Sequence, residues 1–114
     1  MGQSTAWKEW ERVVAGKIRG ERRGAYTGRG GQGRTDIIHD FIDAECKLLS
    51  QPQYRDLRNA CRQAKENGDG GIPIAFVRKK GEEWRDALVV MEMGEFTKVV
   101  NRLEELCNEE DEDA

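Results

Sequence analysis

The chain has 114 residues, which allows one compact domain, and no apolar run approaches the roughly 18 residues needed to cross a bilayer. We therefore expect a soluble protein of the cytoplasm with no membrane partner. The formal net charge of −3 argues as a total against a nucleic-acid partner, but residues 104–113 hold seven acids and no base, and the rest of the chain carries +4.

The first third of the chain is predicted to form a helix, a glycine-rich segment and two strands. Apolar residues at helical spacing between Trp7 and Ile18 predict a helix over residues 5–19 that Gly20 ends. Residues 20–34 contain six glycines, so we expect a mobile loop or hairpin with one short strand near residues 25–27. Residues 35–38 and 41–48 are predicted strands, because the second run alternates apolar and charged residues.

The second half of the chain is predicted to contain two helices and two buried strands. Pro52 suits the first turn of a helix that ends near Asn67, with Ser50 or Gln51 at its cap. Residues 74–77 and 87–91 are predicted strands, and residues 96–107 an amphipathic helix. The predicted fold is a single α/β domain over residues 1–107, a mixed sheet flanked by helices in the order α-β-β-β-α-β-β-α, followed by an acidic, disordered tail at residues 108–114.

Zinc and nucleotide motifs lack the context that they require. Three cysteines without CxxC spacing and one histidine do not make a common zinc set, and we expect free thiols. Residues 28–33 match the pattern GxGxxG, but a strand is expected after these glycines, where phosphate binding needs a helix. Neither ligand is therefore assigned.

Asp36, Glu45 and Lys47 are the most informative charged residues. Glu45 and Lys47 lie two apart on one predicted strand and Asp36 starts the strand before it, so we expect all three side chains on one face. Two carboxylates suit a divalent cation such as Mg²⁺, and an ammonium group beside them can hold or activate an attacking water. The alternative is an outward face of solvated charges.

A carboxylate and a basic segment extend this pattern. Glu11 lies on or beside the apolar stripe of the first helix, so it needs either an arginine partner or a place in the metal cluster. Residues 12–34 hold seven bases and one acid, and arginine forks suit phosphate oxygens, although a solvated basic loop is the alternative. The candidate DNA contacts are Arg19, Arg22, Arg23, Arg29 and Arg34.

An ordered set of short motifs spans roughly residues 7–100. It consists of Trp10-Glu11-Arg12, Thr35-Asp36-Ile37-Ile38, Glu45-Cys46-Lys47 nine residues after the aspartate, Gln63-Ala64, and a late strand at residues 86–91. With this set the chain resembles the PD-(D/E)XK nuclease superfamily, most closely the small phage and archaeal Holliday junction resolvases. Thr35 stands where that family has proline, and Asp40 is a rival for the first metal carboxylate.

The resemblance implies a restriction-endonuclease-like core and a metal-dependent endonuclease. Asp36, Glu45 and the Cys46 carbonyl would ligate Mg²⁺, for which Mn²⁺ would substitute. Glu11 would be a further acid of the metal site, Lys47 would orient water or stabilise the developing charge, and Gln63 would lie beside the site.

The resemblance also implies a partner and a setting. The expected substrate is DNA, in four-way junctions or other branched structures, cut by a homodimer in the cytoplasm of a cell, which is the host cell if the chain is encoded by a phage. Two alternatives stay open: a nicking or restriction-type nuclease on duplex DNA, and a noncatalytic DNA-binding or phage interaction protein.

Overall fold

The computed structural model describes residues 5–23 and 34–113 and contains both helices and strands. The strands are β1 (Glu21–Arg22), β2 (Ile37–Ile38), β3 (Ile42–Leu49), β4 (Ile72–Lys79) and β5 (Leu88–Val90). The helices are α1 (Ala6–Ile18), α2 (Tyr54–Asn67) and α3 (Met93–Asp113), with a 3₁₀ turn, η1, at Trp84–Asp86. The expected single α/β domain is confirmed. The strand expected near residues 25–27 lies outside the described residues, and β1 falls at the start of the segment expected to be a loop.

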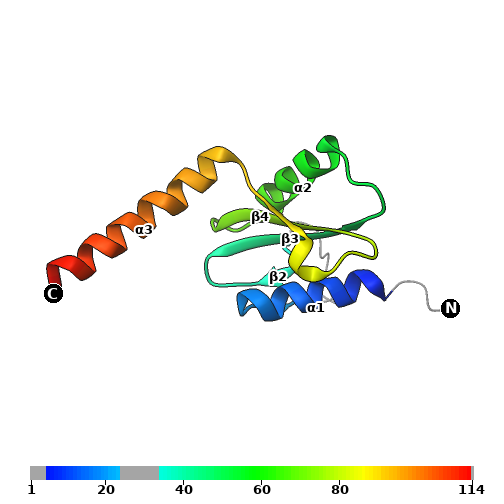
Figure 1. Cartoon of the computed structure of the whole chain (residues 1–114), viewed down its shortest axis with the longest axis horizontal. Coiled ribbons are helices and arrows are strands. Elements are labelled where there is room, and N and C mark those ends of the chain that lie inside the picture. The colour runs from blue at the N-terminus through cyan, green and yellow to red at the C-terminus, as the bar shows by residue number, and fades with distance from the viewer. Residues whose placement is uncertain (1–4, 24–33, 114) are drawn as a thin grey trace.

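The five strands form one mixed sheet in the order β1-β2-β3-β4-β5. The pairs β1–β2, β2–β3 and β4–β5 are antiparallel, whereas β3 and β4 run parallel, with Glu45 opposite Ala75 and Lys47 opposite Val77. A parallel pair needs a long crossover, and α2 provides it. Figure 1 shows α1 and α2 on opposite sides of this sheet.

Alternation along β3 and β4 divides the core between the two helices. On the α1 side, Ala44 and Phe76 pack with Trp10 and Val14, and on the α2 side Ala75 and Val77 pack with buried residues of that helix, Ala60 and Cys61. Because successive side chains of a strand point to opposite faces, Glu45 and Lys47 lie on the α2 side of β3.

The start of α2 differs from the prediction. Pro52 lies before the helix, and the cap is Gln53, whose side chain accepts from the backbone of Asp56 while the Asp56 carboxylate accepts from the Gln53 N–H at 2.9 Å. Placing Pro52 in the first turn, with Ser50 or Gln51 as the cap, was therefore wrong. The reciprocal pair satisfies two backbone donors at once, which favours a start after the proline.

The last helix is longer at both ends than expected. It begins at Met93 and continues through residues 108–113, where a disordered tail was predicted. Residues 108–113 contain no glycine or proline, and glutamate is a good helix former, which outweighs the acidic composition. Figure 1 shows α3 leading away from the sheet. Within the described ranges, no helix is both long and apolar enough to span a membrane.

Trp10 joins α1 to the middle of the sheet. Its side chain is 4% exposed and its indole N–H donates to the Phe76 carbonyl at 3.0 Å.

We predict that Trp10→Ala lowers the free energy of unfolding by about 3–5 kcal/mol in urea titrations, because it empties a core site and leaves that carbonyl without its donor. The control Trp7→Ala, at a position 42% exposed, should cost less than about 1 kcal/mol. Equal losses for the two variants would contradict this packing.

Candidate active site

The predicted site residues meet where β2 separates from β3. Asp36 stands directly before β2, and its backbone N–H donates to the Ala44 carbonyl at 3.1 Å. Its Oδ2 accepts the backbone N–H of Cys46 at 2.7 Å. Because β2 is only two residues long, the Asp36 carboxylate supplies the acceptor for this β3 donor. Asp36 is thereby held beside the Glu45-Cys46-Lys47 segment.

Glu45 is buried and Lys47 reaches solvent. The Glu45 side chain is 6% exposed and that of Lys47 31%, and their Oε2 and Nζ atoms are 3.5 Å apart. The other carboxylate oxygen, Glu45 Oε1, is buried without a hydrogen-bond partner in the part of the chain that the structure describes. The face is therefore not an ordinary solvated one, because a buried carboxylate oxygen normally has a donor or a cation.

Glu11 has an arginine partner and also belongs to this site. It is 7% exposed in α1, and its Oε1 accepts from Arg22 Nε at 2.8 Å. Its pKa is raised by burial and then by the negative charge of Asp36, and lowered by Arg22. The two roles considered from the sequence are thus compatible, since the arginine neutralises one side of an acid that also faces Asp36.

Burial raises the pKa of each of the neighbouring acids Asp36 and Glu45. Burial, followed by repulsion from Asp36, raises the pKa of Glu45 from 4.5 to about 7, against the attraction of Lys47. Burial also raises the pKa of Asp36, although its hydrogen bond from Cys46 and the charge of Lys47 oppose the change. A cation bound among these oxygens would reverse both effects, because it favours the ionised carboxylates.

The thiol of Cys46 is not a ligand in this arrangement. Burial first, and then the negative charges of Asp36, Glu11 and Glu45, raise its pKa far above that of a free cysteine. Only a thiolate binds metal well. If Cys46 contributes to a metal site, the contribution is therefore its backbone carbonyl, as the resemblance implies.

The arginines of the basic segment have different surroundings. Arg22 is held by Glu11, and Arg23 donates to the Thr35 carbonyl at 2.7 Å and to its hydroxyl at 3.2 Å. Arg34 is exposed. Arg19 is exposed at the end of α1, where its positive φ of 60° ends the helix. Arg29 lies outside the described residues.

A polar cleft borders the site. It has a volume of about 500 Å³, and its lining includes Arg23, Arg34, His39, Asp43 and Asn67. Thr35 holds Arg23 at this cleft through the two hydrogen bonds above. Two arginines thus stand beside an opening next to the carboxylates.

Gln63 and Asp40 are not part of the site. Gln63 is exposed on α2 and makes no hydrogen bond to a site residue within the described chain. Asn67, one helical turn later, lies beside Glu45 and lowers its pKa. Sequence reasoning missed it, although the spacing of four from Gln63 places both on one helix face. Asp40 is exposed and lines a different cavity with Glu95 and Lys98, so Asp36 is the carboxylate that meets Glu45.

His39 has a structural role. Its Nδ1 accepts the backbone N–H groups of Phe41 and Ile42, each at 3.2 Å. Nε2 therefore carries the proton and donates to the Ile18 carbonyl at 2.8 Å. These contacts fix the β2–β3 turn against the end of α1, so the ring has no free nitrogen for acid–base chemistry.

The donor set fits a divalent cation that takes most of its ligands from water and phosphate. It does not fit a cation bound by protein side chains alone. Over residues 5–23 and 34–113 no three side chains among His, Cys, Asp and Glu group closely enough to hold a metal by themselves. Mg²⁺ commonly uses one or two carboxylates and takes its other ligands from water and phosphate. The unpartnered Glu45 Oε1 and the neighbouring Asp36 match that requirement.

Comparison of the chain with protein-family models, curated proteins and solved structures found no match.

The raised pKa of Glu45 predicts how stability depends on pH. Between pH 4.5, the ordinary pKa of this group, and about pH 7, its pKa in the folded chain, the folded chain binds more protons than the unfolded chain. The contribution of Glu45 to the free energy of unfolding is therefore greatest below pH 4.5 and is lost as the pH rises through 7. Without metal, Glu45→Gln should therefore raise the free energy of unfolding at about pH 8 by up to about 3 kcal/mol and change it little at about pH 5.

The same variant also tests the metal. Mg²⁺ should raise the melting temperature of the natural chain at about pH 8 but not that of Glu45→Gln, because binding to the folded state alone stabilises it. The matched control is Glu66→Gln, an exposed position of α2, which should respond to Mg²⁺ as the natural chain does. If Glu45→Gln lowered the free energy of unfolding at pH 8 in EDTA, the ionised Glu45 carboxylate would not destabilise the folded chain.

Proposed function

We propose that the protein is a metal-dependent endodeoxyribonuclease that hydrolyses phosphodiester bonds in branched DNA, in the manner of a Holliday junction resolvase. One observation carries the proposal. Asp36 is held beside Glu45-Cys46-Lys47 by its hydrogen bond from the Cys46 N–H, Lys47 lies 3.5 Å from Glu45, and one buried oxygen of Glu45 has no protein partner in the described chain. A buried carboxylate oxygen without a donor is a position that a bound cation can complete.

The element order supports the finer fold assignment, a restriction-endonuclease-like core. An antiparallel β1–β2–β3 unit follows α1, and α2 then crosses to β4, which is parallel to β3. This arrangement brings a helix acid, a strand-start aspartate and a mid-strand ExK segment to one corner of the sheet, in the order in which the motifs occur along the chain.

In this proposal Asp36 and Glu45 hold Mg²⁺, with the Cys46 carbonyl as a further ligand. The bound ion would polarise the scissile phosphate and lower the pKa of a bound water. Lys47 has the exposure to reach that water or the phosphate, and its ammonium group can orient one or stabilise the charge that develops on the other. Glu11, neutralised on one side by Arg22, adds a negative charge that keeps the cation in place.

The polar cleft beside the site suits the DNA backbone. Arg23 and Arg34 line it, and Arg23 is held in one orientation by Thr35. Two arginines beside a cation site can contact the phosphates that flank the scissile bond. Because opposed cuts on a two-fold symmetric junction need two sites, the proposal includes a homodimer.

Catalytic variants give the direct test. Lys47→Ala and Glu45→Gln should each reduce Mg²⁺-dependent cleavage of a labelled synthetic four-way junction at least about 100-fold, because each removes a group that acts on the reacting atoms. Both should leave junction binding in EDTA unchanged. The control Asp40→Asn removes the rival carboxylate and should cleave as the natural chain does.

The substrate arms of the same assay separate the alternatives. Junction, flap and linear duplex are each incubated with Mg²⁺ or EDTA. Preferential cleavage of the junction supports the proposal, cleavage of linear duplex at the same rate indicates a nicking or restriction-type nuclease, and binding without cleavage of any substrate indicates a noncatalytic module.

The salt dependence of DNA binding tests whether the polar cleft contacts the DNA backbone. Arg34→Gln should weaken binding of every DNA sequence and reduce the slope of log affinity against log salt by about 0.9, the value of one lost phosphate contact. Arg62→Gln, an exposed arginine of α2 that does not line the cleft, is the control and should keep the original slope. An unchanged slope for Arg34→Gln would remove this cleft from the DNA interface.

A further inference from the structure

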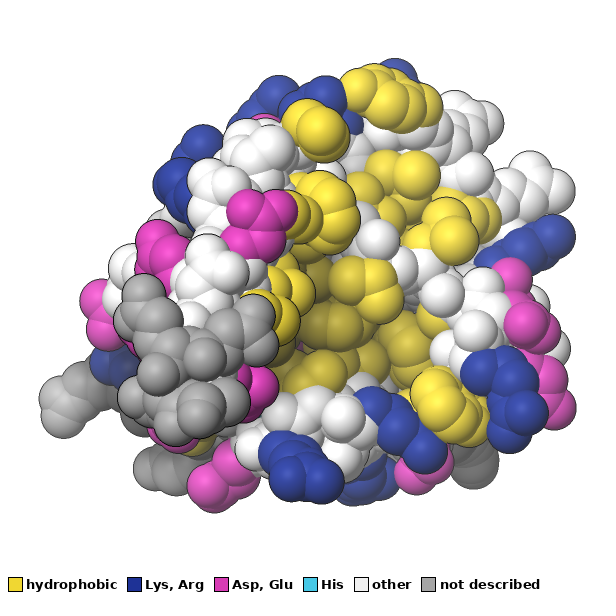
Figure 2. Space-filling model, turned by 60° about the vertical axis from the view of Figure 1, so that its left-hand side comes forward, with side chains coloured by type: hydrophobic (Ala, Val, Ile, Leu, Met, Phe, Trp, Pro, Cys, Tyr) yellow, Lys and Arg dark blue, Asp and Glu magenta, His cyan; other side chains and the backbone are white. Residues whose placement is uncertain are grey.

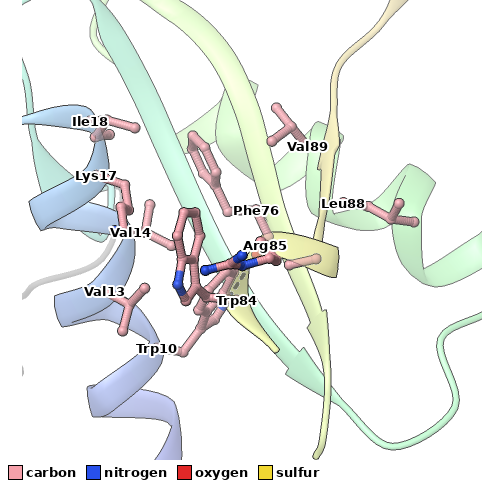
Figure 3. Close-up of a pocket in the computed structure, with 11 residues that line it drawn as sticks. Trp10, Val13, Val14, Lys17, Ile18, Phe76, Trp84, Arg85, Leu88 and Val89 are labelled. Atoms are coloured by element: carbon pink, nitrogen blue, oxygen red, sulfur yellow. Dashed lines mark hydrogen bonds between the residues drawn. The ribbon is translucent and has the colours of Figure 1, made fainter. Parts of the chain in front are cut away.

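An apolar hollow remains open beside α1. It has a volume of about 220 Å³ and is formed by Trp10, Phe76, Trp84 and Val89 with other apolar residues of α1 and β5. Figure 3 shows these side chains around the opening, and Figure 2 shows hydrophobic side chains gathered in a hollow on the side toward which α3 projects. Trp84 is 39% exposed and Val89 63%. Exposed aromatic and branched side chains around a hollow are typical of a binding surface.

The charged residues around this hollow are cationic. Its lining includes Lys17 and Arg85 and no acidic residue, and Lys17 Nζ lies 3.9 Å from the centre of the Trp84 ring. A complementary occupant would therefore have an apolar surface flanked by acids.

The chain itself contains such an element. Helix α3 has an apolar stripe at helical spacing, formed by Phe96, Val99, Val100, Leu103, Leu106 and Cys107. Residues 101–110 are all exposed, and Leu103 and Leu106 are 56% and 40% exposed. Acidic residues flank the distal half of the stripe. An amphipathic helix with an unburied apolar face is normally completed by another surface.

The start of α3 keeps this helix away from the hollow of its own chain. Glu92, just before α3, is held by Arg58 at 3.2 Å and Lys65 at 3.4 Å, both from α2. The hollow lies on the α1 side of the sheet. Only Met91 and Glu92 separate β5 from α3, which is too short a link to carry the helix around the sheet edge.

We propose that α3 of one protein chain docks its apolar stripe in the hollow of a second copy, and that the second α3 returns the contact. The pairing is reciprocal, so one two-fold axis uses the helix and the hollow twice and doubles the buried area, of which a stable interface needs roughly 1,200–2,000 Å². The acids of the helix then face Lys17 and Arg85 of the partner. This pairing deepens the homodimer of the proposed function by giving it a geometry, but it is argued from the hollow and α3 and not from nuclease chemistry, and its test needs no DNA.

The test is the molar mass of the full chain by light scattering over a concentration series. The natural chain should have twice the 13.0 kDa of one chain. A helix variant, Leu103→Asp with Leu106→Asp, and a hollow variant, Val89→Asp, should each raise the dimer dissociation constant at least about tenfold. Asn101→Asp, which adds one negative charge off the stripe of α3, should remain dimeric, and circular dichroism should show all of these variants folded.

Mixing the two defective variants distinguishes the geometry. A helix variant and a hollow variant together retain one intact helix and one intact hollow, so the mixture should form heterodimers although each variant alone is monomeric. A monomeric natural chain would overturn the proposal. So would a hollow variant that stays dimeric while the helix variant is monomeric, because α3 would then pair with α3.

Discussion

The structure is organised around the free-energy cost of burying carboxylates on both sides of the point where Asp36 meets β3. Glu11, Asp36 and Glu45 come from a helix, a strand start and a strand, and each has its pKa raised by burial. Arg22 compensates Glu11, and the Cys46 N–H compensates Asp36. Glu45 keeps one buried oxygen without a partner. Raised pKa values of neighbouring carboxyl groups are a feature of functional sites, and the functional proposal is therefore placed here.

The scaffold around this corner is rigid for identifiable reasons. The register of the parallel β3–β4 pair fixes the positions of Glu45 and Lys47 along the sheet, and Trp10 joins α1 to the same pair through its hydrogen bond to the Phe76 carbonyl. His39 joins the β2–β3 turn to the end of α1 with both ring nitrogens occupied. These contacts position α1, the β2–β3 turn and β3, the segments that carry or adjoin the three acids.

The charge segregation of the chain has a spatial counterpart. Arg23 and Arg34 line the polar cleft and Arg22 pairs with Glu11, whereas the acids of α3 lie on a helix that leaves the sheet (Figure 1). The net charge of −3 therefore describes neither surface. In the proposed dimer the acids of α3 face the cations beside the apolar hollow of the partner, which leaves the cleft free for DNA.

The sequence by itself determined the α/β class and the positions of most elements, because periods of 2 and 3.6 residues report which side chains are buried. Its motif spacing also singled out Asp36, Glu45, Lys47 and Glu11. Only the tertiary structure decided that Asp36 rather than Asp40 meets Glu45, that Arg22 pairs with Glu11, and that Asn67 rather than Gln63 lies beside Glu45. It also showed that α3 runs to Asp113 and leaves its apolar stripe unburied. These outcomes depend on contacts between segments distant in the chain, and local periodicity carries no information about which distant partner a side chain meets.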